Sequence, residues 1–452
     1  LLLLIIGSVA VCIRLKTGGP MIGLFFSWII IYLFCKWLKI KYDHVVSGAY
    51  DAIRVVVPTL CLLMAIGVMI GTWLQSGTIA TIIAGGLKLI DPTWLLPLTL
   101  VFCAVLSLVT GTSYGSVGSA GVAMMAIGNA MGIKPGMVAG AVICGAMFGD
   151  KLSPLSDTTN LAPAVAGAKL NDHVRSMLWT TLPTFVISLV LFVILGISQT
   201  SGGYEEGNLL VYTEALQGEF KLGLVTLIPA AVIIVLLLCK VNAIVSLGLS
   251  SVCAGAVAFF CQGATLQSII RVAYNGYTTQ IEEAVLKTIL NRGGMSSMLQ
   301  YVAIICFAVG MGGMLDRLGV LDNILRAITG RINSDGGLIF ATLLVGYITS
   351  LISCSQPMSH VLTGNMMKPL FKERKIAPEI LSRSLEDAGT LSGPMIPWHG
   401  YCVYMAGTLG VAWSEFFPYL FLLYLTPFFS IFYGFTGISI RHVEDENEQK
   451  QG

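Results

Sequence analysis

Charged side chains are scarce in this sequence. Asp, Glu, Lys and Arg make up 11% of the 452 residues, whereas a soluble globular protein carries about 25%. The 26 basic and 24 acidic residues nearly cancel, which leaves a net charge of +2 and no strong field to attract a polyanion. The composition therefore excludes an ordinary soluble domain and predicts no nucleic-acid partner.

Motifs for redox, metal or nucleotide chemistry are missing as well. The 11 cysteines are scattered, mostly inside apolar runs, without a C-x-x-C pair, so we interpret them as small reduced hydrophobic residues. No Walker motif is present, and the G-x-G-x-x-G-like glycines lie inside apolar segments, where close helix packing explains them. The sequence thus predicts neither an enzyme nor a resident cofactor.

Long apolar runs are what the sequence has in abundance. Hydrophobic residues make up 55% of the chain, and the mean hydropathy is +0.83. Many runs reach the roughly 20 residues that cross a hydrocarbon core of about 30 Å. We therefore predict an all-α polytopic membrane protein embedded in a lipid bilayer, with about ten spanning segments. These segments are 1–15, 20–40, 54–75, 137–168, 178–197, 221–240, 243–261, 299–316, 378–412 and 416–437.

The distribution of charge between these segments predicts their orientation. Basic residues gather in four connections, which the positive-inside rule places in the cytoplasm. The segment 198–220 carries four glutamates and neither Lys nor Arg, so we expect it outside. Arg441 and His442 predict a cytoplasmic C-terminus that ends in the acidic tail 441–452. The four basic connections lie at 36–54, 169–175, 317–331 and 368–375.

The two halves of the chain resemble each other at a spacing of about 240 residues. Gly71–Gly77 matches Gly313–Gly319, and Thr110–Ser113 matches Ile352–Ser355, in the same order. These matches predict two repeats, residues 1–220 and 221–440. Equivalent loops differ in charge and each repeat holds an odd number of spans, so we expect the repeats to be inverted relative to each other.

Four segments are too polar or too broken to be ordinary membrane helices. Segments 94–132 and 337–370 are bisected by polar turns and predict two re-entrant hairpins, whereas 137–168 and 378–412 predict two broken helices. Such backbone survives at membrane depth only where it is buried in protein or lines a water-filled cavity. Inverted repeats with broken helices are typical of secondary transporters, whose binding site lies where the breaks meet.

The first hairpin turn and the first broken helix offer oxygen ligands. The turn reads TGTSYGS over Thr110–Ser116, and its hydroxyls and carbonyls suit a small hard cation such as sodium. The alternative is a flexible polar turn outside the membrane. The broken helix reads GDKLSPLSDTTN over Gly149–Asn160, where Pro154 removes a backbone donor.

Two aspartates in this broken helix are candidates for sodium ligation or proton carriage. Ionisable residues inside a membrane usually mark an ion path. A carboxylate that holds either sodium or a proton, but not both, produces exchange by competition. The alternative is a structural ion pair between Lys151 and one of these aspartates. The candidate sodium and proton residues are Thr110, Thr112, Ser113, Asp150, Ser153, Asp157, Thr158 and Asn160.

The second half repeats this pattern with different side chains. Its hairpin turn reads SCSQPMSH over Ser353–His360, and its broken helix reads EDAGTLSGPMIPWH over Glu386–His399. A salt bridge from Arg383 is the alternative role for the two acids, and hydrogen bonding inside the core is the alternative for the histidines, which otherwise suit proton relay. Trp398 suits packing or a cavity wall. The candidate solute residues are Ser353, Ser355, Gln356, Glu386, Asp387, Thr390, Trp398 and His399.

Two stretches resemble a known family. GDKLSPLSDTTNLAPA (Gly149–Ala164) resembles the hallmark of the NhaC-type sodium/proton antiporter family, and LSRSLEDAGTLSGPMIPW (Leu381–Trp398) resembles its second-half signature. The resemblance spans residues 50–440. It implies a prokaryotic inner-membrane antiporter that moves sodium against protons by alternating access. The family belongs to an ion-transporter superfamily with a hairpin and an unwound helix in each repeat. Many superfamily members are dimers with an elevator-like moving domain, which makes a homodimer one candidate assembly.

The resemblance carries over onto a defined set of residues, with two departures. The matching positions are Thr112, Ser113, Asp150, Ser153, Asp157, Thr158 and Asn160, then Glu386, Asp387, Gly389 and Thr390.

The departures change the charge expected in the second half. The second hairpin lacks the acid of a TGDQ-like turn and reads Ser353-Cys-Ser-Gln356, and the PWN after the second break is here Pro397-Trp398-His399. Because this sequence lacks the hairpin carboxylate and has an imidazole after the second break, a second function stays open. It is sodium- or proton-coupled transport of a small organic acid or amino acid, which the family also contains.

Overall fold

The computed structural model describes residues 1–14, 20–200, 207–320 and 334–443, and the regular elements in this part of the chain are helices, with one isolated β-bridge between Ile376 and His442. Six of the described helices are long and apolar enough to cross a membrane, and the number rises to nine if each of three bent helix pairs is one span. The predicted all-α membrane protein is therefore confirmed. The predicted basic connection at 317–331 and the acidic tail lie largely outside the described residues.

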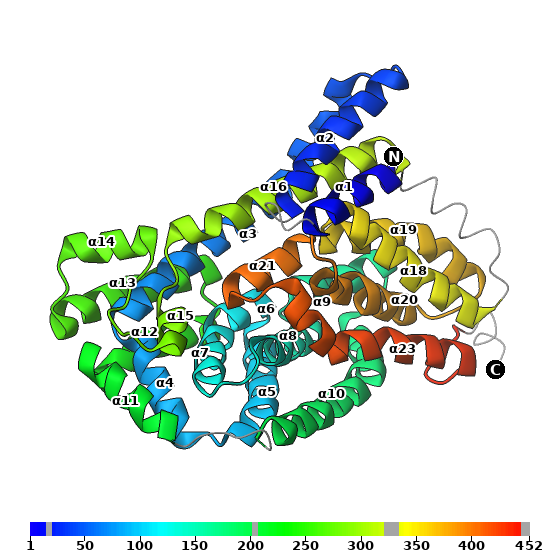
Figure 1. The fold of residues 1–452 in the computed structure, drawn as a ribbon. Helices are drawn as coiled ribbons and strands as arrows, with labels where there is room; N and C mark the ends of the chain where they lie inside the picture. Colours follow the sequence, from blue (N-terminus) through cyan, green and yellow to red (C-terminus); the bar gives the residue numbers. More distant parts are fainter. Residues whose placement is uncertain (15–19, 201–206, 321–333, 444–452) are drawn as a thin grey trace.

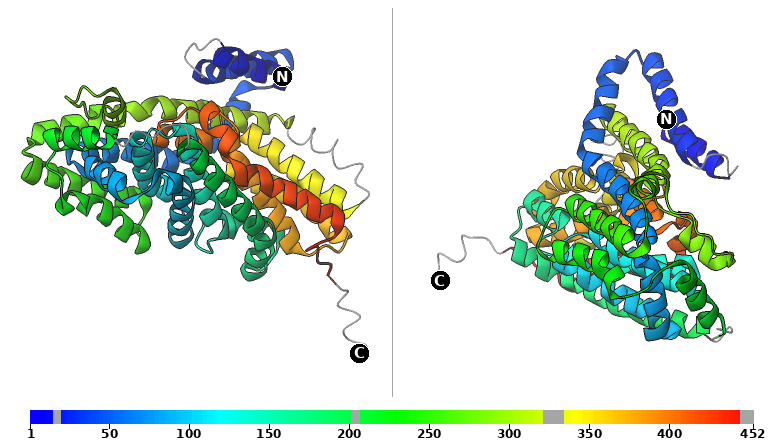
Figure 2. Two further views of the ribbon diagram at one scale, coloured as in Figure 1. Left: turned by 60° about the horizontal axis from the view of Figure 1, so that its bottom comes forward. Right: turned by 90° about the vertical axis from the view of Figure 1, so that its left-hand side faces the viewer.

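The N-terminal helices form an arm that projects from the body (Figures 1 and 2). A turn with Lys39 in the left-handed region (φ 60°) joins the second and third helices. The third helix begins at Tyr42, so the predicted span 54–75 forms only its C-terminal part. Its acidic and basic residues lie on exposed faces instead of ending the helix, and Asp51 pairs with Arg317 at 2.9 Å. The helices are α1 (Leu2–Arg14), α2 (Pro20–Trp37) and α3 (Tyr42–Gln75).

The first half then contains the predicted hairpin segment and broken helix. Gly111, with φ 69°, ends one helix, and Thr112 caps the next by accepting a hydrogen bond from the Gly115 amide. The broken helix bends by 49°. These elements are α4 (Thr78–Leu89), α5 (Pro92–Thr110), α6 (Ser113–Ser116), η1 (Val117–Gly121), α7 (Val122–Ala130), α8 (Pro135–Leu152), α9 (Asp157–Ala166) and α10 (Leu170–Thr200).

The next six helices lie within residues 207–290, and all but the first belong to the predicted second half. The segment that was expected only as an acidic external connection contains α11, which is bent by 87° relative to the helix that follows. The sequence analysis also missed α4, α14 and α15, because none of them has the length of a membrane span. These helices are α11 (Gly207–Glu219), η2 (Leu224–Leu227), α12 (Ile228–Leu238), α13 (Ala243–Gln262), α14 (Leu266–Asn275) and α15 (Ala284–Leu290).

The second half repeats the order of a long helix, a hairpin segment and an interrupted helix. Cys354, with φ 56°, turns the chain between the two hairpin helices, which pack against each other. The helices are α16 (Met295–Arg317), α18 (Asp335–Ser353), α19 (Gln356–Glu373), α20 (Pro378–Leu385), η3 (Glu386–Thr390), η4 (Gly393–Met395), α21 (Gly400–Leu409), α22 (Trp413–Phe416), η5 (Phe417–Tyr419) and α23 (Phe421–Thr436). The inverted relation of the halves and the re-entrant nature of the hairpins stay predictions.

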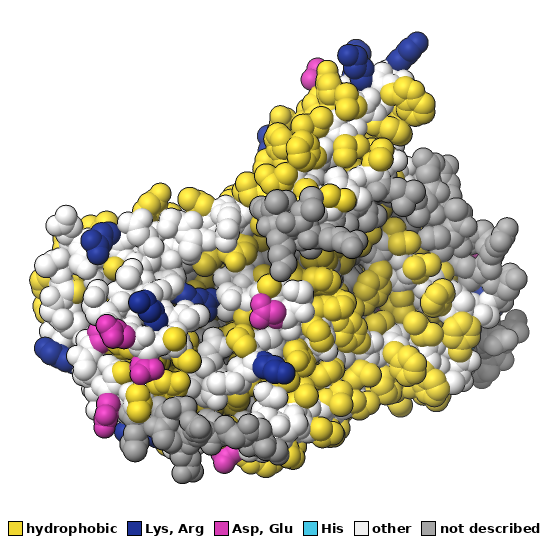
Figure 3. Space-filling model, viewed as in Figure 1, with side chains coloured by type: hydrophobic (Ala, Val, Ile, Leu, Met, Phe, Trp, Pro, Cys, Tyr) yellow, Lys and Arg dark blue, Asp and Glu magenta, His cyan; other side chains and the backbone are white. Residues whose placement is uncertain are grey.

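The interrupted helices meet in the middle of the molecule. In Figure 1, α12–α15 lie on the left and α18, α19, α20 and α23 on the right, with α5, α6 and α8 between them. Helix α6 packs against α8, and η1 packs against α21. The outer surface is rich in exposed Leu, Ile, Val and Phe, and Figure 3 shows them across the right half of one face, with charges at the left and at the tip of the arm. Apolar surface outside and broken helices inside suit a bilayer-embedded binding site.

Helices α3 and α16 pack closely through glycines. The Gly294 amide, just before α16, donates a 2.7 Å hydrogen bond to the Gly67 carbonyl. A Cβ on Gly67 would lie 2.6 Å from the Gly294 carbonyl oxygen. Only a hydrogen atom fits there, so the two backbones can touch as they do in other small-residue membrane contacts.

We expect Gly67→Ala to lower the thermal stability of the purified protein in detergent. The added methyl group meets backbone that cannot rotate away, and such overpacking costs about 1–3 kcal/mol. Gly85→Ala is the matched control, because nothing lies within 4 Å of a Cβ at that helical position. Equal melting temperatures for the two variants would show that α3 and α16 separate without cost.

Candidate functional site

Three segments that are far apart in the sequence meet at one buried hydrogen-bonded group. The Ser113 hydroxyl, at the first hairpin turn, donates to Asp150 Oδ2 at the end of α8 and also contacts the Tyr401 hydroxyl of α21. All three side chains are buried. Because the one hydroxyl hydrogen of Ser113 goes to Asp150, the Tyr401 hydroxyl donates to Ser113 Oγ. The group joins the two halves of the chain.

Aromatic contacts hold the first hairpin turn against α21. The ring of Tyr114 lies 4.5 Å from the rings of both Tyr401 and Tyr404, measured between centroids. The Tyr404 hydroxyl donates a 2.7 Å hydrogen bond to the Tyr114 carbonyl. These contacts fix the hydroxyl of Tyr401 beside Ser113.

The hairpin turn also lies directly against the break between α8 and α9. A Cβ on Gly111 would lie 2.6 Å from Leu155 Cβ, so only glycine fits there. Thr159 donates to the carbonyls of Asp150 and Lys151 at 3.0 and 3.1 Å and so satisfies the end of α8. The predicted meeting of the first hairpin turn with the first break is thus present in the structure.

A second buried group is the ion pair of Lys151 and Asp387. Both side chains have no exposed surface, and the Thr180 hydroxyl donates to the same aspartate oxygen at 3.1 Å. The sequence left open a pairing of Lys151 with Asp150 or Asp157, and the structure pairs it with the opposite half instead. Among the described residues Arg383 forms no salt bridge with Glu386 or Asp387, and it donates to Ser439 Oγ at 2.9 Å.

Glu386 is a buried carboxylate at the start of the second break. It begins the π-helical turn η3, and neither of its oxygens has a partner in the described part of the chain. The charged groups that act on it are Lys151, Asp150 and Asp387. A buried polar group without a partner requires an explanation, and an ion or a proton at this place supplies one.

The second hairpin lies against the same π-helical turn. The Gln356 amide donates to the Thr390 carbonyl at 2.8 Å, and the Thr390 hydroxyl lies 3.0 Å from His360 Nε2. His399 accepts the Tyr401 amide on Nδ1 at 3.0 Å. Within the described residues, His360 Nδ1, His399 Nε2 and Ser355 Oγ have no partner although they are buried. Two imidazoles and a hydroxyl therefore offer unused hydrogen-bonding atoms at the second hairpin and the second broken helix.

The remaining predicted residues lie at the edge of this site. Asp157 and Asn160 are exposed at the start of α9, although Asp157 still acts electrostatically on Asp150. Trp398 is half-buried and donates to the Leu351 carbonyl at 3.2 Å, which suits a packing role. Local hydrogen bonds occupy the others. Thr110 and Ser353 donate to the carbonyls of Leu106 and Ser355, Thr112 and Ser153 accept from the amides of Gly115 and Leu155, and Thr158 shares a hydrogen bond with Ser156.

Tyr401 and Thr180 are site residues that sequence reasoning missed. Tyr401 follows His399 by two positions, so a polar hydroxyl so close to the second break was a usable signal. Thr180 lies in an apolar helix with several other threonines, and nothing in the sequence separates it from them. In the described residues, no group of three or more His, Cys, Asp and Glu side chains is placed to hold a metal ion.

Two cavities flank the site. One of about 450 Å³ lies between α3, α16 and the second hairpin turn, where Ser353 and Ser355 line it. The other, of about 460 Å³, is lined by Arg292, Gln300 and Tyr301 and by Gly407 and Gly410 of α21. Both place open space beside the elements that carry the buried polar groups.

If Asp150 holds the sodium ion that the sequence motifs predict, Tyr401→Phe is expected to weaken sodium binding without unfolding the protein. The substitution removes one hydroxyl and keeps the ring packed on Tyr114. A hydrogen bond contributes about 1 kcal/mol, which is about fivefold in affinity. The sodium dependence of exchange measures this change, and Tyr404→Phe, whose hydroxyl bonds a backbone carbonyl instead, is the matched control. An unchanged sodium affinity in Tyr401→Phe would remove this hydroxyl from the site.

A helical membrane protein that brings buried carboxylates and hydroxyls to the breaks of its helices has the architecture of a secondary transporter. The Na⁺/H⁺ antiporter family model matches residues 145–438. The chain is 36% identical over 422 residues to the Na⁺/H⁺ antiporter NhaC of Alkalihalophilus pseudofirmus, covering 93% of this chain and 91% of that protein. The chain belongs to this family of antiporters, as its motifs predicted, and the family is one of transporters and not of enzymes.

Two other relatives are named for different solutes. The malate-2H⁺/Na⁺-lactate antiporter of Bacillus subtilis is 35% identical over 416 residues, covering 92% of this chain and 89% of that protein. The arginine/ornithine antiporter ArcD of Halobacterium salinarum is 32% identical over 412 residues, covering 91% and 85%. Membership in the family therefore leaves the solute of this chain open.

Proposed function

We propose that this chain exchanges sodium for protons across a prokaryotic inner membrane, with Asp150 as the carboxylate for which the two ions compete. The observation that carries this proposal is the burial of Asp150 beside Ser113 and Tyr401, where two halves of the chain meet. An isolated negative charge is costly away from water, so the carboxylate holds either a cation or a proton. Binding one ion releases the other, which is exchange.

Hydroxyl and carboxylate oxygens supply the remaining ligands. Ser113 contacts Asp150 directly, Tyr401 contacts Ser113, and Glu386 is the second buried acid near Asp150. Oxygen ligands of this kind suit a hard cation. Asp157, exposed at the start of α9, is placed to receive the ion before it reaches Asp150.

Alternating access is the transport mode that we propose. Its support comes from the order of elements in the two halves and from the cavities beside α3 and α16. In this proposal residues 1–220 and 221–440 are inverted repeats of about ten spans in all, including two re-entrant hairpins and two broken helices. An elevator-like movement and a homodimer belong to the same proposal.

A second candidate function is coupled transport of a small organic acid or amino acid. The observation that favours it is the unpartnered Nε2 of His399, which lies close to Gln356. A Cβ on Gly393 would be 3.1 Å from the Gln356 amide nitrogen and 3.3 Å from His399 Cε1, so both side chains border the same backbone. Their hydrogen-bond donors suit a carboxylate, as in the solutes named for two of the relatives.

Flux measurements in proteoliposomes separate the two functions. A sodium gradient should drive a pH change inside liposomes that contain the protein and no organic solute. Sodium-dependent uptake of labelled malate, lactate, arginine or ornithine, with no pH change in their absence, would favour the second function and refute the first.

A further inference from the structure

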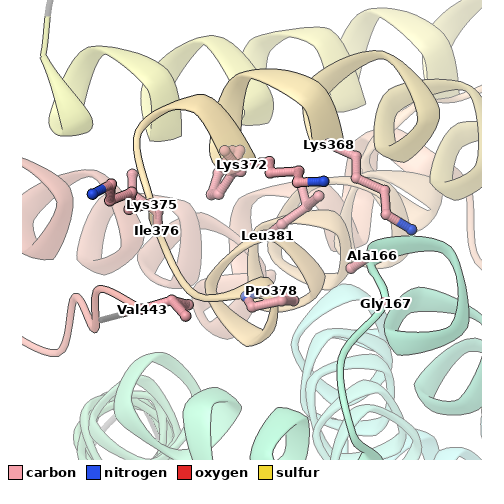
Figure 4. Close-up of a pocket in the computed structure, with 10 residues that line it drawn as sticks. Ala166, Gly167, Lys368, Lys372, Lys375, Ile376, Pro378, Leu381 and Val443 are labelled. Carbon is pink, nitrogen blue, oxygen red and sulfur yellow. The ribbon is translucent and has the colours of Figure 1, made fainter. Parts of the chain in front are cut away.

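A cavity of about 480 Å³ lies apart from the buried carboxylates, between the end of α9, the connection from α19 to α20 and the C-terminal segment (Figure 4). Three of the residues that line it are lysines, Lys368, Lys372 and Lys375, and none is acidic. We call it the lysine pocket. The proposed ion-exchange site binds cations, so ion exchange does not explain why this pocket is lined by lysines.

Two of the lysines form the charged side of the lysine pocket. Lys368 and Lys372 are four residues apart on α19, so they share one face of the helix, where like charges repel. Figure 4 shows their amines on the same side, with Lys368 towards the Ala166–Gly167 turn and the Lys375 amine pointing the other way. Lys368 donates one of its three hydrogens to the Val165 carbonyl at 3.0 Å. An anion between the two amines would offset their repulsion.

Within the described residues, no acidic side chain neutralises Lys368 or Lys372. In the described residues neither Lys368 nor Lys372 has an ion pair, and Glu379 at the start of α20 is bound by Arg441 at 2.6 Å. Both lysines are exposed and can therefore reach a ligand.

The other side of the lysine pocket is apolar. Phe371, Ile376 and Leu381 are buried in its wall, and Val443 covers it with 47% of its surface exposed. The Val443 amide donates to the Lys375 carbonyl at 2.7 Å, which holds the C-terminal segment across the lysine pocket. A ligand that fills this space must join an anionic group to an apolar chain.

We propose that the lysine pocket binds an anionic phospholipid, with its headgroup phosphate on Lys368 and Lys372 and its first acyl carbons against Phe371 and Val443. The connection 368–375 is one that the positive-inside rule places at the cytoplasmic face, where anionic lipids gather and basic pockets between helices hold their headgroups. The lipid would brace α9 against α19 and α20, which already pack together.

Two other occupants satisfy only the charged half of the lysine pocket. Residues 444–452 follow Val443 and read EDENEQKQG, which offers acids but no apolar side chain. A free phosphate has no apolar part either. Both leave the apolar wall uncovered, so the lipid is the occupant that the lining favours.

The test uses the full-length protein in a neutral detergent, titrated with phosphatidylglycerol or with phosphatidylcholine of the same acyl chains. Native mass spectrometry and thermal stability report binding. We expect retention and stabilisation with phosphatidylglycerol alone, and about tenfold or greater weakening in the double variant Lys368→Gln/Lys372→Gln. Lys88→Gln, at an exposed lysine of α4 outside the lysine pocket, is the control and should bind like the wild type.

Three results would overturn the proposal. One is equal binding of both lipids. Another is a response to glycerol 3-phosphate as strong as that to phosphatidylglycerol, which would indicate a free phosphate site. The third is lipid binding that begins only when residues 444–452 are removed, which would show that the acidic tail occupies the lysine pocket in the intact protein.

Discussion

Asp150→Asn is expected to reduce sodium/proton exchange to the level of protein-free liposomes while the protein still folds. Asparagine keeps the shape of the side chain and can still accept the hydrogen bond from Ser113. It cannot take up a proton or balance the charge of a sodium ion, so neither half of the exchange cycle is possible. The measurement is the sodium-driven pH change in proteoliposomes, with yield and thermal stability as the record of folding.

Two further variants make this result specific. Asp43→Asn removes an exposed aspartate at the start of α3 and should leave the flux unchanged. Asp157→Asn removes the other predicted carboxylate. Because Asp157 is exposed, its charge is solvated by water and does not require a bound ion or proton, so we expect a lowered but measurable rate of exchange. Wild-type exchange in Asp150→Asn would exclude Asp150 as the carrier. Loss of exchange in Asp157→Asn alone would transfer that role to Asp157.

Lys151→Met is expected to destabilise the protein more than any other single change discussed. Lys151 and Asp387 are both fully buried and paired. Breaking such a pair leaves an uncompensated charge in the interior and costs about 3–5 kcal/mol. Asp387→Leu should be milder, because Glu386 remains close enough to act on Lys151. The yield of monodisperse protein and its melting temperature measure both effects.

The double substitution Lys151→Met/Asp387→Leu separates structure from transport. Removing both charges often restores stability, because the cost of burying them disappears as well. We therefore expect the double variant to be more stable than Lys151→Met. A stable double variant that exchanges ions at the wild-type rate would make the pair purely structural. A double variant as unstable as the single ones would show that each charge depends on other partners.

The elements near the breaks were the predictable part of this molecule. Irregular backbone could be predicted at Pro154 in one apolar run and at the polar turns 110–116 and 353–360 in two others. Irregular backbone occurs at membrane depth only where it is buried in protein or lines a cavity, so these turns were expected to lie inside the molecule. The sequence therefore located Ser113, Asp150, Glu386 and Asp387 without knowledge of their contacts. Helix ends were less predictable. Charges near residue 50 suggested a loop, but an exposed helix face accommodates them equally well.

The side-chain contacts between the two halves could not be predicted from the sequence. Lys151 and Asp387 lie 236 positions apart, and each has a closer charged neighbour in sequence, Asp150 for the lysine and Arg383 for the aspartate. Spacing alone favours those neighbours, whereas the packing of α8, α10 and the second broken helix decides otherwise. The place of Tyr401 just after the second break made it a candidate, but its partner Ser113 lies in the other half and could not be predicted from spacing.

The pairing of Lys151 with Asp387 also has a consequence for biosynthesis. A ribosome that adds about 5–20 residues per second makes the lysine about 12–47 s before its partner, given the 236 positions between them. Throughout that interval the nascent chain presents an unmatched ammonium group to the insertion machinery. The N-terminal half is therefore incomplete as a folding unit, and we expect a chain that ends before Asp387 to be less stable than the full chain.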